Sequence, residues 1–172
     1  MKLFIASDIH GSAYFCRRMV EKYRESGAER LVLLGDILYH GPRNDLPREY
    51  APKEVIAMLN PLSSEIIAVR GNCDTEVDQM VLTFPILAEQ GMIADNEHRI
   101  FLIHGHKELD RLEALLGTGD IILFGHTHVP SEKAGKNGCL ILNPGSISIP
   151  KENSGHAYMI YENGKFTRHT VE

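Results

Sequence analysis

The chain has 172 residues, with 18 basic residues against 23 acidic ones, a formal net charge of -5 at pH 7 and nine histidines. This acidic balance argues against a protein that binds extended nucleic acid, because that class presents a basic face. Cys16, Cys73 and Cys139 are odd in number and widely separated, which is typical of reduced cytoplasmic thiols. No apolar run reaches 18 residues, and the amino terminus becomes polar too soon for a signal peptide. We therefore expect one cytoplasmic domain over residues 1–172 that does not enter a membrane.

Six short apolar runs divide the chain and predict strands. They cover residues 3–6, 31–34, 66–69, 100–103, 121–124 and 140–142. Continuous runs of this length are typical of strands that are covered on both faces. Between the first two runs, the apolar residues of segment 12–26 recur at helical spacing, and Gly27 follows as a stop. The chain therefore opens with a strand, a helix and a second strand.

A long loop and two more helices are predicted after this opening unit. Residues 38–51 are rich in Pro, Gly and charge without periodicity, and long ordered loops are usually functional. Pro52 suits the first turn of a helix that ends before Pro61. Residues 108–116 place three leucines on one face, and Gly117 follows.

The end of the sequence predicts a hairpin. Residues 157–161 and 165–171 flank Asn163-Gly164, which is the pair typical of a two-residue primed turn. With strands and helices alternating before it, the pattern indicates an α/β fold with a largely parallel core and antiparallel additions.

A side chain that can bind a metal ion follows each of the first five apolar runs. These side chains are Asp8, His10, Asp36, Asn72, His104, His126 and His128. In an open α/β sheet, ligands bind beyond the carboxyl ends of the strands, so these groups should converge at one edge. A single such residue is more often a turn or cap residue. Five coincident strand ends, each flanked by a glycine, instead indicate a site.

The composition of this set predicts two divalent metal ions. Seven donors are too many for one tetrahedral ion, and a carboxylate can bridge two ions because its oxygens offer several lone pairs. Oxygen and nitrogen donors without thiolate favour Mn²⁺, Fe²⁺ or Zn²⁺. Two such ions can clamp a phosphoryl group during an in-line displacement. We take Mn²⁺ as the expected activating ion, with Ni²⁺, Fe²⁺ and Zn²⁺ as alternatives.

The same positions form motifs that resemble the calcineurin-like metallophosphoesterase superfamily. In chain order they are Asp8-Ile9-His10, Gly35-Asp36, Gly71-Asn72-Cys73-Asp74, His104-Gly105-His106 and Gly125-His126-Thr127-His128. Two further matches, His40-Gly41-Pro42-Arg43-Asn44 and Asn143-Pro144-Gly145-Ser146, resemble the small bacterial and archaeal phosphodiesterases of the YfcE type. The resemblance runs from Met1 to about Pro150. It implies a sandwich of two facing β-sheets flanked by helices, with a dinuclear metal site at the carboxyl ends of the strands.

The resemblance also implies a role for each motif. One ion would be held by Asp8, His10, Asp36 and His128, and the other by Asp36, Asn72, His104 and His126. Asp36 would then be the bridge, and the hydroxide that bridges the ions would attack phosphorus opposite the leaving oxygen. The expected catalytic residues are Asn72, Cys73, Asp74 and His104. Asp74 would orient a neighbouring group or cap the turn.

Cys73 departs from the family pattern. Many relatives have histidine here, and that imidazole is the expected proton donor to the leaving group. A thiol is a weak donor and becomes an anion when it loses its proton. We therefore expect a hydrolase of small phosphodiesters with fairly acidic leaving groups that is weak on alkyl phosphomonoesters. Alternatively, Cys73 is only a small apolar filler.

The expected substrate-binding residues are His40, Arg43, Asn44, Cys73 and His106. Arg43 and Asn44 can bind phosphate, but ordinary surface roles remain open for them, and His106 is as readily a solvated loop histidine.

Two other functions stay open. One is a non-catalytic scaffold, because the retromer subunit with this fold resembles a metallophosphoesterase but serves as a scaffold. The other is a nuclease or cyclic nucleotide phosphodiesterase. The acidic chain argues only against enzymes that track polymers. The sequence also leaves open a homo-oligomer such as a dimer.

Overall fold

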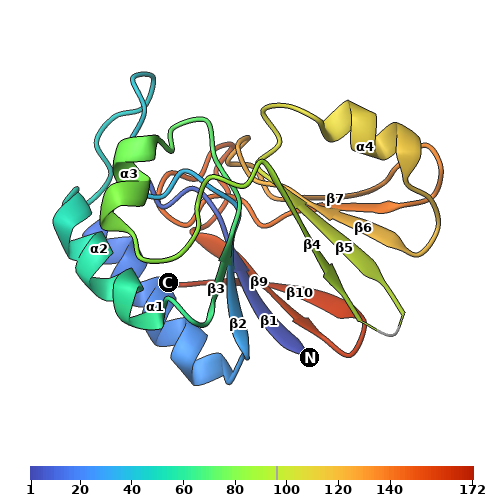
Figure 1. The fold of residues 1–172 in the computed structure, drawn as a ribbon, viewed down its shortest axis with the longest axis horizontal. Coiled ribbons are helices and arrows are strands. Elements are labelled where there is room, and N and C mark those ends of the chain that lie inside the picture. The colour runs from blue at the N-terminus through green and yellow to red at the C-terminus, as the bar shows by residue number, and fades with distance from the viewer. Residues whose placement is uncertain (96) are drawn as a thin grey trace.

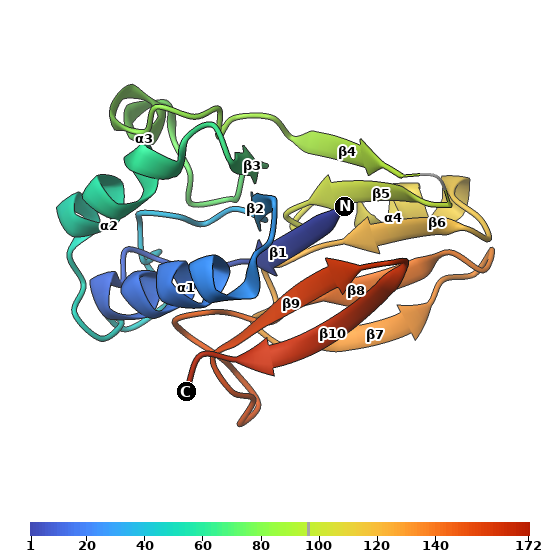
Figure 2. The same ribbon diagram turned by 90° about the horizontal axis from the view of Figure 1, so that it is seen from below.

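The strands form two five-stranded sheets that face each other, with helices outside both sheets (Figures 1 and 2). The computed structural model describes residues 1–95 and 97–172. The strands are β1 (Lys2–Ala6), β2 (Arg30–Leu33), β3 (Ile66–Ala68), β4 (Gln90–Ala94), β5 (Arg99–Ile103), β6 (Asp120–Leu123), β7 (Ser131–Ala134), β8 (Leu140–Asn143), β9 (Ala157–Glu162) and β10 (Lys165–Thr170). The helices are α1 (Ala13–Ser26), α2 (Pro52–Leu59), α3 (Glu76–Val81) and α4 (Leu109–Leu115), with a short 3₁₀ turn at Asn60–Leu62.

Each sheet has a parallel core with antiparallel additions. The first sheet has the order β10-β9-β1-β2-β3, and β1, β2 and β3 are parallel. The second has the order β4-β5-β6-β8-β7, and β5, β6 and β8 are parallel. Strands β4, β7, β9 and β10 pair antiparallel with their neighbours. The predicted α/β class and the two-sheet sandwich that the resemblance implied are therefore confirmed.

Alternate side chains of the parallel strands fill different layers of the core. Phe4 packs with the cluster that includes residues of α1 and α2, whereas Ile5 packs between the two sheets. On the second sheet, Leu102 faces the first sheet and Ile103 packs with Leu112 of α4. Because successive side chains point to opposite faces of a strand, a strand covered on both faces must be apolar at consecutive positions. This explains the six continuous apolar runs of the sequence.

Local signals set the ends of the predicted helices. The Ser12 hydroxyl accepts the Phe15 N–H and caps α1, which ends at Gly27 in the left-handed conformation at φ 67°. Pro52 occupies the first turn of α2. In the predicted hairpin, Asn163 and Gly164 have φ values of 51° and 76° and join β9 to β10.

Three elements lacked a clear sequence signal. Helix α3 buries none of its side chains, so it has no apolar periodicity and starts instead with a capping box at Thr75 and Asp78. Strand β4 contains Gly91, and β7 is largely exposed. Among the described residues, the helices are too short or too polar to cross a lipid bilayer.

Candidate metal centre

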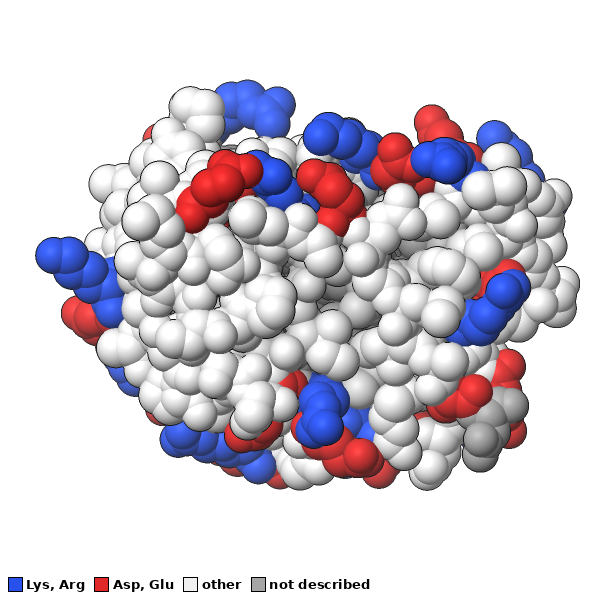
Figure 3. All heavy atoms as spheres, viewed as in Figure 1, with Lys and Arg blue, Asp and Glu red and all other residues white. Residues whose placement is uncertain are grey.

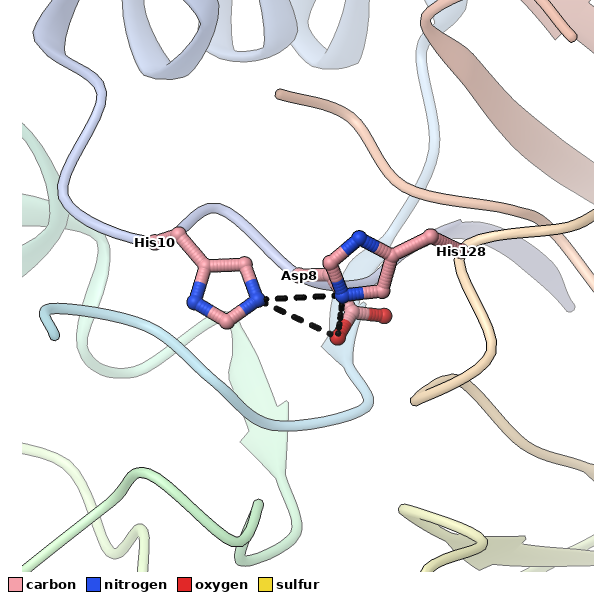
Figure 4. A group of neighbouring side chains, drawn as sticks. All are labelled: Asp8, His10 and His128. Carbon is pink, nitrogen blue, oxygen red and sulfur yellow. Dashed lines mark hydrogen bonds and ion pairs between the residues drawn. The ribbon is translucent and has the colours of Figure 1, made fainter. Parts of the chain in front are cut away.

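The loops that follow β1 and β6 bring one group of predicted donors together. His10 Nε2 and His128 Nε2 are 3.2 Å apart. Asp8 Oδ1 lies 3.6 Å from His10 Nε2 and 3.2 Å from His128 Nε2. Figure 4 shows both imidazole edges and the carboxylate turned toward one point. All three side chains are buried, although His10 and His128 are 118 residues apart in the chain.

Asp36, in the loop after β2, lies between this group and a second one. Its Oδ2 is 3.6 Å from His10 Nε2 and 3.4 Å from His104 Nε2. His104 Nε2 is also 3.0 Å from Asn72 Oδ1. The donor atoms of Asp8, Asp36 and His104 all lie within 4.8 Å of one another. Asp36 is thus central among the seven predicted donors.

His126 lies at the rim of this arrangement. Its ring centroid is 5.1 Å from that of His104, and its backbone N–H donates to Asp8 Oδ2 at 3.1 Å. Its side chain is partly exposed and lines the cleft above the other donors. The structure therefore gathers six of the predicted donors closely and leaves the seventh beside them.

Five of the predicted donors have a left-handed backbone conformation. The φ values are 58° for Asp8, 49° for His10, 56° for Asp36, 65° for His126 and 61° for His128. Such a conformation costs a residue other than glycine about 1–3 kcal/mol and persists only where the surroundings impose it. The turns that direct these side chains inward therefore carry strain, which is common at functional sites.

Backbone carbonyl groups fix the orientation of three imidazoles. His10 Nδ1 donates to Tyr39 O, His104 Nδ1 to Leu34 O and His128 Nδ1 to Ile149 O, each at 2.7 Å. Because a carbonyl oxygen only accepts hydrogen bonds, each Nδ1 carries a proton. In the neutral ring Nε2 then presents a lone pair to the shared centre, which is the tautomer of a metal ligand whose other nitrogen is anchored.

These donors fit a bound cation. Asp8 Oδ1 is buried and has no hydrogen-bond partner among the described residues. The Nε2 lone pairs of neutral His10 and His128 would repel each other unless a proton or a metal ion lay near both. Two donor atoms that bind the same ion, each at about 2.1 Å, lie roughly 3.0–3.4 Å from each other at tetrahedral or octahedral angles. Two of the three distances around Asp8, both 3.2 Å, fall within this range, and the third, 3.6 Å from Asp8 Oδ1 to His10 Nε2, lies just beyond it.

The close packing of carboxylates and imidazoles shifts their pKa values. Burial alone would raise the pKa of Asp8, but the neighbouring imidazoles of His10 and His128, when protonated, outweigh it and hold that pKa well below its ordinary value. Burial disfavours the charged form of His104 too, yet Asp36 and Asp8 raise the pKa of His104 to about 9. The pKa of His10 is also raised, against its burial, by Asp8. Because protons and metal ions compete for the same Nε2 atoms, metal binding must displace protons.

Asp74 braces the backbone beneath the donors. Its carboxylate accepts the N–H groups of Asp36, Ile37 and Gly71 at 2.8, 2.9 and 2.7 Å. Gly71 is needed here because a Cβ at this position would collide with the Asp36 carboxylate. Asp74 therefore orients the Asp36 loop and makes these contacts from a buried position, outside the cleft lining.

Cys73 lies directly beside the donors. Its backbone N–H donates to Asp36 Oδ1 at 2.8 Å, and its Sγ lies within 4.8 Å of donor atoms of His10 and Asp36. Asn72 Nδ2 donates to Sγ at 3.3 Å. Burial, reinforced by the Asp36 carboxylate, raises the pKa of the Cys73 thiol to about 12. Such a thiol keeps its proton at neutral pH.

A cleft of about 350 Å³ opens above the donors. Arg43 and Asn44, in the loop of residues 38–51, line it together with Asp36, Asn72 and Cys73. These two predicted substrate-binding residues therefore face the same space as the candidate metal ligands.

The other two predicted substrate contacts lie outside the cleft lining. The His40 ring packs against Tyr39 and Tyr50, and the His106 ring centroid is 5.4 Å from that of His104. Each ring has a buried Nδ1 without a hydrogen-bond partner among the described residues. Burial and the neighbouring His104 lower the pKa of His106. Substrate roles for His40 and His106 stay predictions.

Sequence reasoning missed several residues of the site. Lys151 and Thr127 line the cleft. The hydroxyls of Ser146 and Ser148 both donate to the Asp8 carbonyl oxygen, at 2.9 and 2.8 Å, and hold the turn after β1. Ser146 belongs to a motif noted in the sequence, whereas Lys151 and Ser148 stand in a segment without periodicity that gave no signal.

Comparison with known proteins identifies the fold and its relatives. The family model described as the calcineurin-like phosphoesterase superfamily domain matches residues 1–165. The chain is 47% identical over 164 residues to phosphodiesterase YfcE of Escherichia coli K12, covering 95% of this chain and 88% of YfcE. It is 26% identical over 168 residues to the probable metallophosphoesterase YsnB of Bacillus subtilis, covering 93% of this chain and 83% of YsnB.

Solved structures support the same assignment. The structure of the E. coli phosphoesterase YfcE matches with a TM-score of 0.91 and 42% identity, covering 99% of this chain and 93% of that one. A mutant Vps29 from Entamoeba histolytica matches with a TM-score of 0.65 and 20% identity, covering 98% of this chain and 97% of that one. The second likeness shows a shared fold alone.

Proposed function

Because the chain belongs to the calcineurin-like phosphoesterase superfamily, we propose that it is a metal-dependent phosphodiesterase acting on a small phosphodiester. The observation that carries this proposal is the convergence of buried carboxylates and Nε2 atoms at 3.2–3.6 Å beneath an open cleft. The likeness to phosphodiesterase YfcE over 95% of the chain supports the same reaction class.

The proposed ligand sets follow the sequence analysis. One ion is held by Asp8, His10, Asp36 and His128, and the other by Asp36, Asn72, His104 and His126, with Asp36 shared. When bound, such ions polarise the phosphoryl oxygens and lower the pKa of a water that serves as the nucleophile. We keep Mn²⁺ as the first choice, with Ni²⁺, Fe²⁺ and Zn²⁺ as alternatives.

The remaining residues position the substrate and the ligands. Arg43 and Lys151 place cationic groups in the cleft lining, where they attract the phosphate, and Asn44 offers an amide. Asp74 holds the Asp36 loop through three backbone hydrogen bonds and is a positioning residue in this proposal. Asn72 and His104 act at the metal centre.

Cys73 determines which leaving groups are tolerated. A thiol whose pKa is raised to about 12 is a much weaker acid than an imidazolium ion and so a weaker proton donor to the leaving oxygen. Leaving groups that depart without a proton are therefore favoured. We propose that activity is high on aryl phosphodiesters and weak on alkyl phosphomonoesters.

Metal analysis followed by a substrate panel tests the proposal. We expect about two equivalents of divalent metal per chain, and faster turnover of bis(4-nitrophenyl) phosphate than of a sugar phosphate. The panel is repeated with each added ion, which ranks Mn²⁺ against the alternatives. A diester-to-monoester ratio below one, or no turnover with any ion, would contradict the proposal.

The alternatives are less well supported. The scaffold hypothesis has only fold likeness to Vps29 behind it, whereas the donor set favours an enzyme. On the face in Figure 3, Lys and Arg alternate with Asp and Glu around the rim and form no continuous basic surface, which disfavours a long nucleic acid as substrate. A cyclic nucleotide remains within the proposed class of small diesters. A cytoplasmic location and a homo-oligomer also stay proposals.

A further inference from the structure

An apolar groove lies next to the cleft, between α2, α3 and the loop of residues 38–51. These elements stand side by side at one end of the molecule (Figure 1). The groove has a volume of about 330 Å³, and its lining includes Tyr39, Tyr50, Ile56, Val77 and Val81. Several of these side chains are exposed, with 68% for Val77 and 41% for Tyr39. Clustered exposed apolar side chains usually mark a binding site.

The groove and the cleft meet at Cys73. Among the described lining residues, Cys73 is the one that belongs to both cavities. Its Sγ lies within 4.8 Å of donor atoms of His10 and Asp36, so the groove begins close to the reaction centre.

The two cavities differ in charge. The cleft contains Arg43 and Lys151, whereas the described lining of the groove contains neither Lys nor Arg. The acidic residue of the groove, Asp78, accepts the N–H and the hydroxyl of Thr75 at 2.7 and 2.9 Å within the capping box. The phosphate charge therefore belongs in the cleft, and an uncharged part of a ligand belongs in the groove.

We propose that this groove is a substrate subsite that binds an aromatic ester arm of the phosphodiester while the phosphoryl group lies in the cleft. The proposal rests on the proposed function, because it assigns the groove to that substrate. Tyr39 and Tyr50 offer ring faces and edges for an aromatic arm, and Val77 and Val81 offer apolar surface from α3. The shared lining residue Cys73, which lies beside the candidate metal ligands, is the reason to assign the groove to the substrate.

Competitive inhibition measures binding in the groove separately from the rate of hydrolysis. The reporter is hydrolysis of bis(4-nitrophenyl) phosphate by the metal-loaded protein, and the inhibitors are methyl phenyl phosphate and dimethyl phosphate. Methyl phenyl phosphate is itself an aryl diester and competes as an alternative substrate, so both inhibition constants are taken from initial rates of the reporter. Both inhibitors carry one negative charge, and they differ only in the aromatic arm. We expect the inhibition constant of methyl phenyl phosphate to be about tenfold lower than that of dimethyl phosphate.

Two sets of variants on α3 give a matched comparison. The double variant Val77→Ser with Val81→Ser should raise the inhibition constant of methyl phenyl phosphate about fivefold and leave that of dimethyl phosphate unchanged. Met80 lies on the same helix, is 83% exposed and is outside the groove lining. Met80→Ser should therefore change neither constant. Thermal unfolding of all variants checks that the fold is kept.

Three outcomes would overturn the proposal. The first is an equal effect of the double variant on both inhibitors, and the second is an effect of Met80→Ser as large as that of the double variant. The third is a wild-type oligomer, seen by light scattering, that the serine variants dissociate without changing the inhibitor ratio, since the patch would then be an interface between copies. If the reporter is not hydrolysed with any ion, the proposed function fails instead. Calorimetric measurement of the binding of the same two inhibitors then tests whether the groove binds the aromatic arm, independently of any reaction.

Discussion

The two sheets contribute different chemistry to the candidate metal centre. The first sheet supplies mainly oxygen donors, and the second supplies imidazoles. The donors after the first sheet are Asp8, His10, Asp36 and Asn72, and those after the second are His104, His126 and His128. The closest approaches cross from one sheet to the other, as between His128 and Asp8 or between His104 and Asp36. Neither sheet supplies the whole set of candidate donors, so metal binding at this site would depend on the packing of the two sheets.

The supports of the two donor types also differ. Backbone N–H groups stabilise the carboxylates, as Cys73 N–H does for Asp36 and His126 N–H for Asp8. Backbone carbonyls orient the imidazoles through Nδ1, as Leu34 O does for His104. Carboxylates thus stay ionised and imidazoles keep one tautomer. The carboxylates therefore contact the positive N–H end of peptide groups, and the imidazole N–H groups contact the negative carbonyl end.

Removing the carboxylate of Asp36, which we propose is shared by two ions, should lower activity more than any other change. Asp36→Asn keeps the shape of the side chain but removes the charge next to His10 and His104, so we expect turnover of bis(4-nitrophenyl) phosphate to fall by about 10³-fold or more. Metal content measured on the same preparation should fall too. Asp110→Asn, an exposed carboxylate on α4, is the control. More than a tenth of the wild-type activity, without added metal, would show that Asp36 is not shared by two ions.

Adding an imidazole at position 73, in the loop after β3, should have the next largest effect on turnover. Cys73→His would supply a proton donor beside Asp36, and general acid catalysis is worth about 10²- to 10⁴-fold. We expect turnover of poor leaving groups, such as a sugar phosphate, to rise at least tenfold relative to bis(4-nitrophenyl) phosphate. Cys73→Ser, which adds no such donor, should leave the ratio near that of the wild type. An unchanged ratio in the histidine variant would favour the view that Cys73 is a small filler.

Because Asp36 and His104 come from different sheets, their pairing should make the stability of the protein depend on pH. We expect this dependence to differ between the metal-free and the metal-loaded protein. In the metal-free protein, the folded-state pKa of His104 is raised from 6.5 to about 9 by Asp36, against its burial. The stability from this pair is fully present below pH 6.5 and is lost as the pH rises through 9. The melting temperature of the metal-free protein should therefore fall between pH 6.5 and 9.5, by the equivalent of up to about 3 kcal/mol.

Metal-loaded protein should not show this fall, because the ions require deprotonated imidazoles and bind more tightly as the pH rises. Saturating Mn²⁺ at 100 times its dissociation constant adds about 2.7 kcal/mol to the free energy of unfolding. His104→Asn should flatten the metal-free response. The same downward slope with and without metal would rule out His104 as a ligand.

The smallest effect concerns the support of the turn after β1. Ser148→Ala removes one of two hydroxyl hydrogen bonds to the Asp8 carbonyl oxygen and should cost about 1 kcal/mol. For a chain of this size that is a shift of roughly 2–4 °C in melting temperature. Ser154→Ala, which removes an exposed hydroxyl bonded to Lys151 O, should shift it less. Equal shifts in the two variants would mean that the Asp8 turn needs no special support.

The elements with continuous apolar runs were predictable because burial on both faces leaves a strong local signal. β1, β2 and β6 were found in this way, and α1 by the helical spacing of its apolar residues and by Gly27 as a stop. α3 and β7 were not, because an exposed element has no continuous apolar run and is held by a cap or by pairing with a neighbouring strand. β7 is largely exposed and pairs with the next strand along the chain, β8.

The candidate site was predictable as a set of residue types but not as a geometry. Asp8, His104 and His128 were noticed because side chains that can bind a metal follow five apolar runs in the same way, and because histidine is not a common turn residue. Lys151 was missed because its place in the cleft depends on the path of the chain after β8. The meeting of cleft and groove at Cys73 was equally hidden, since Tyr50 and Val77 come together only in the folded chain.

The antiparallel pairing of β9 with β1 has a consequence for how the chain is made. Strand β1 receives one neighbour, β2, soon after synthesis starts, but its other edge stays open until residues 157–162 emerge. The serines that hold the Asp8 turn and the imidazole of His128 also arrive late. A nascent chain therefore grows by 118 residues between His10 and its partner His128. Contacts this distant in sequence form slowly, and the exposed edge of β1 is vulnerable to pairing with other chains until the last strands close it.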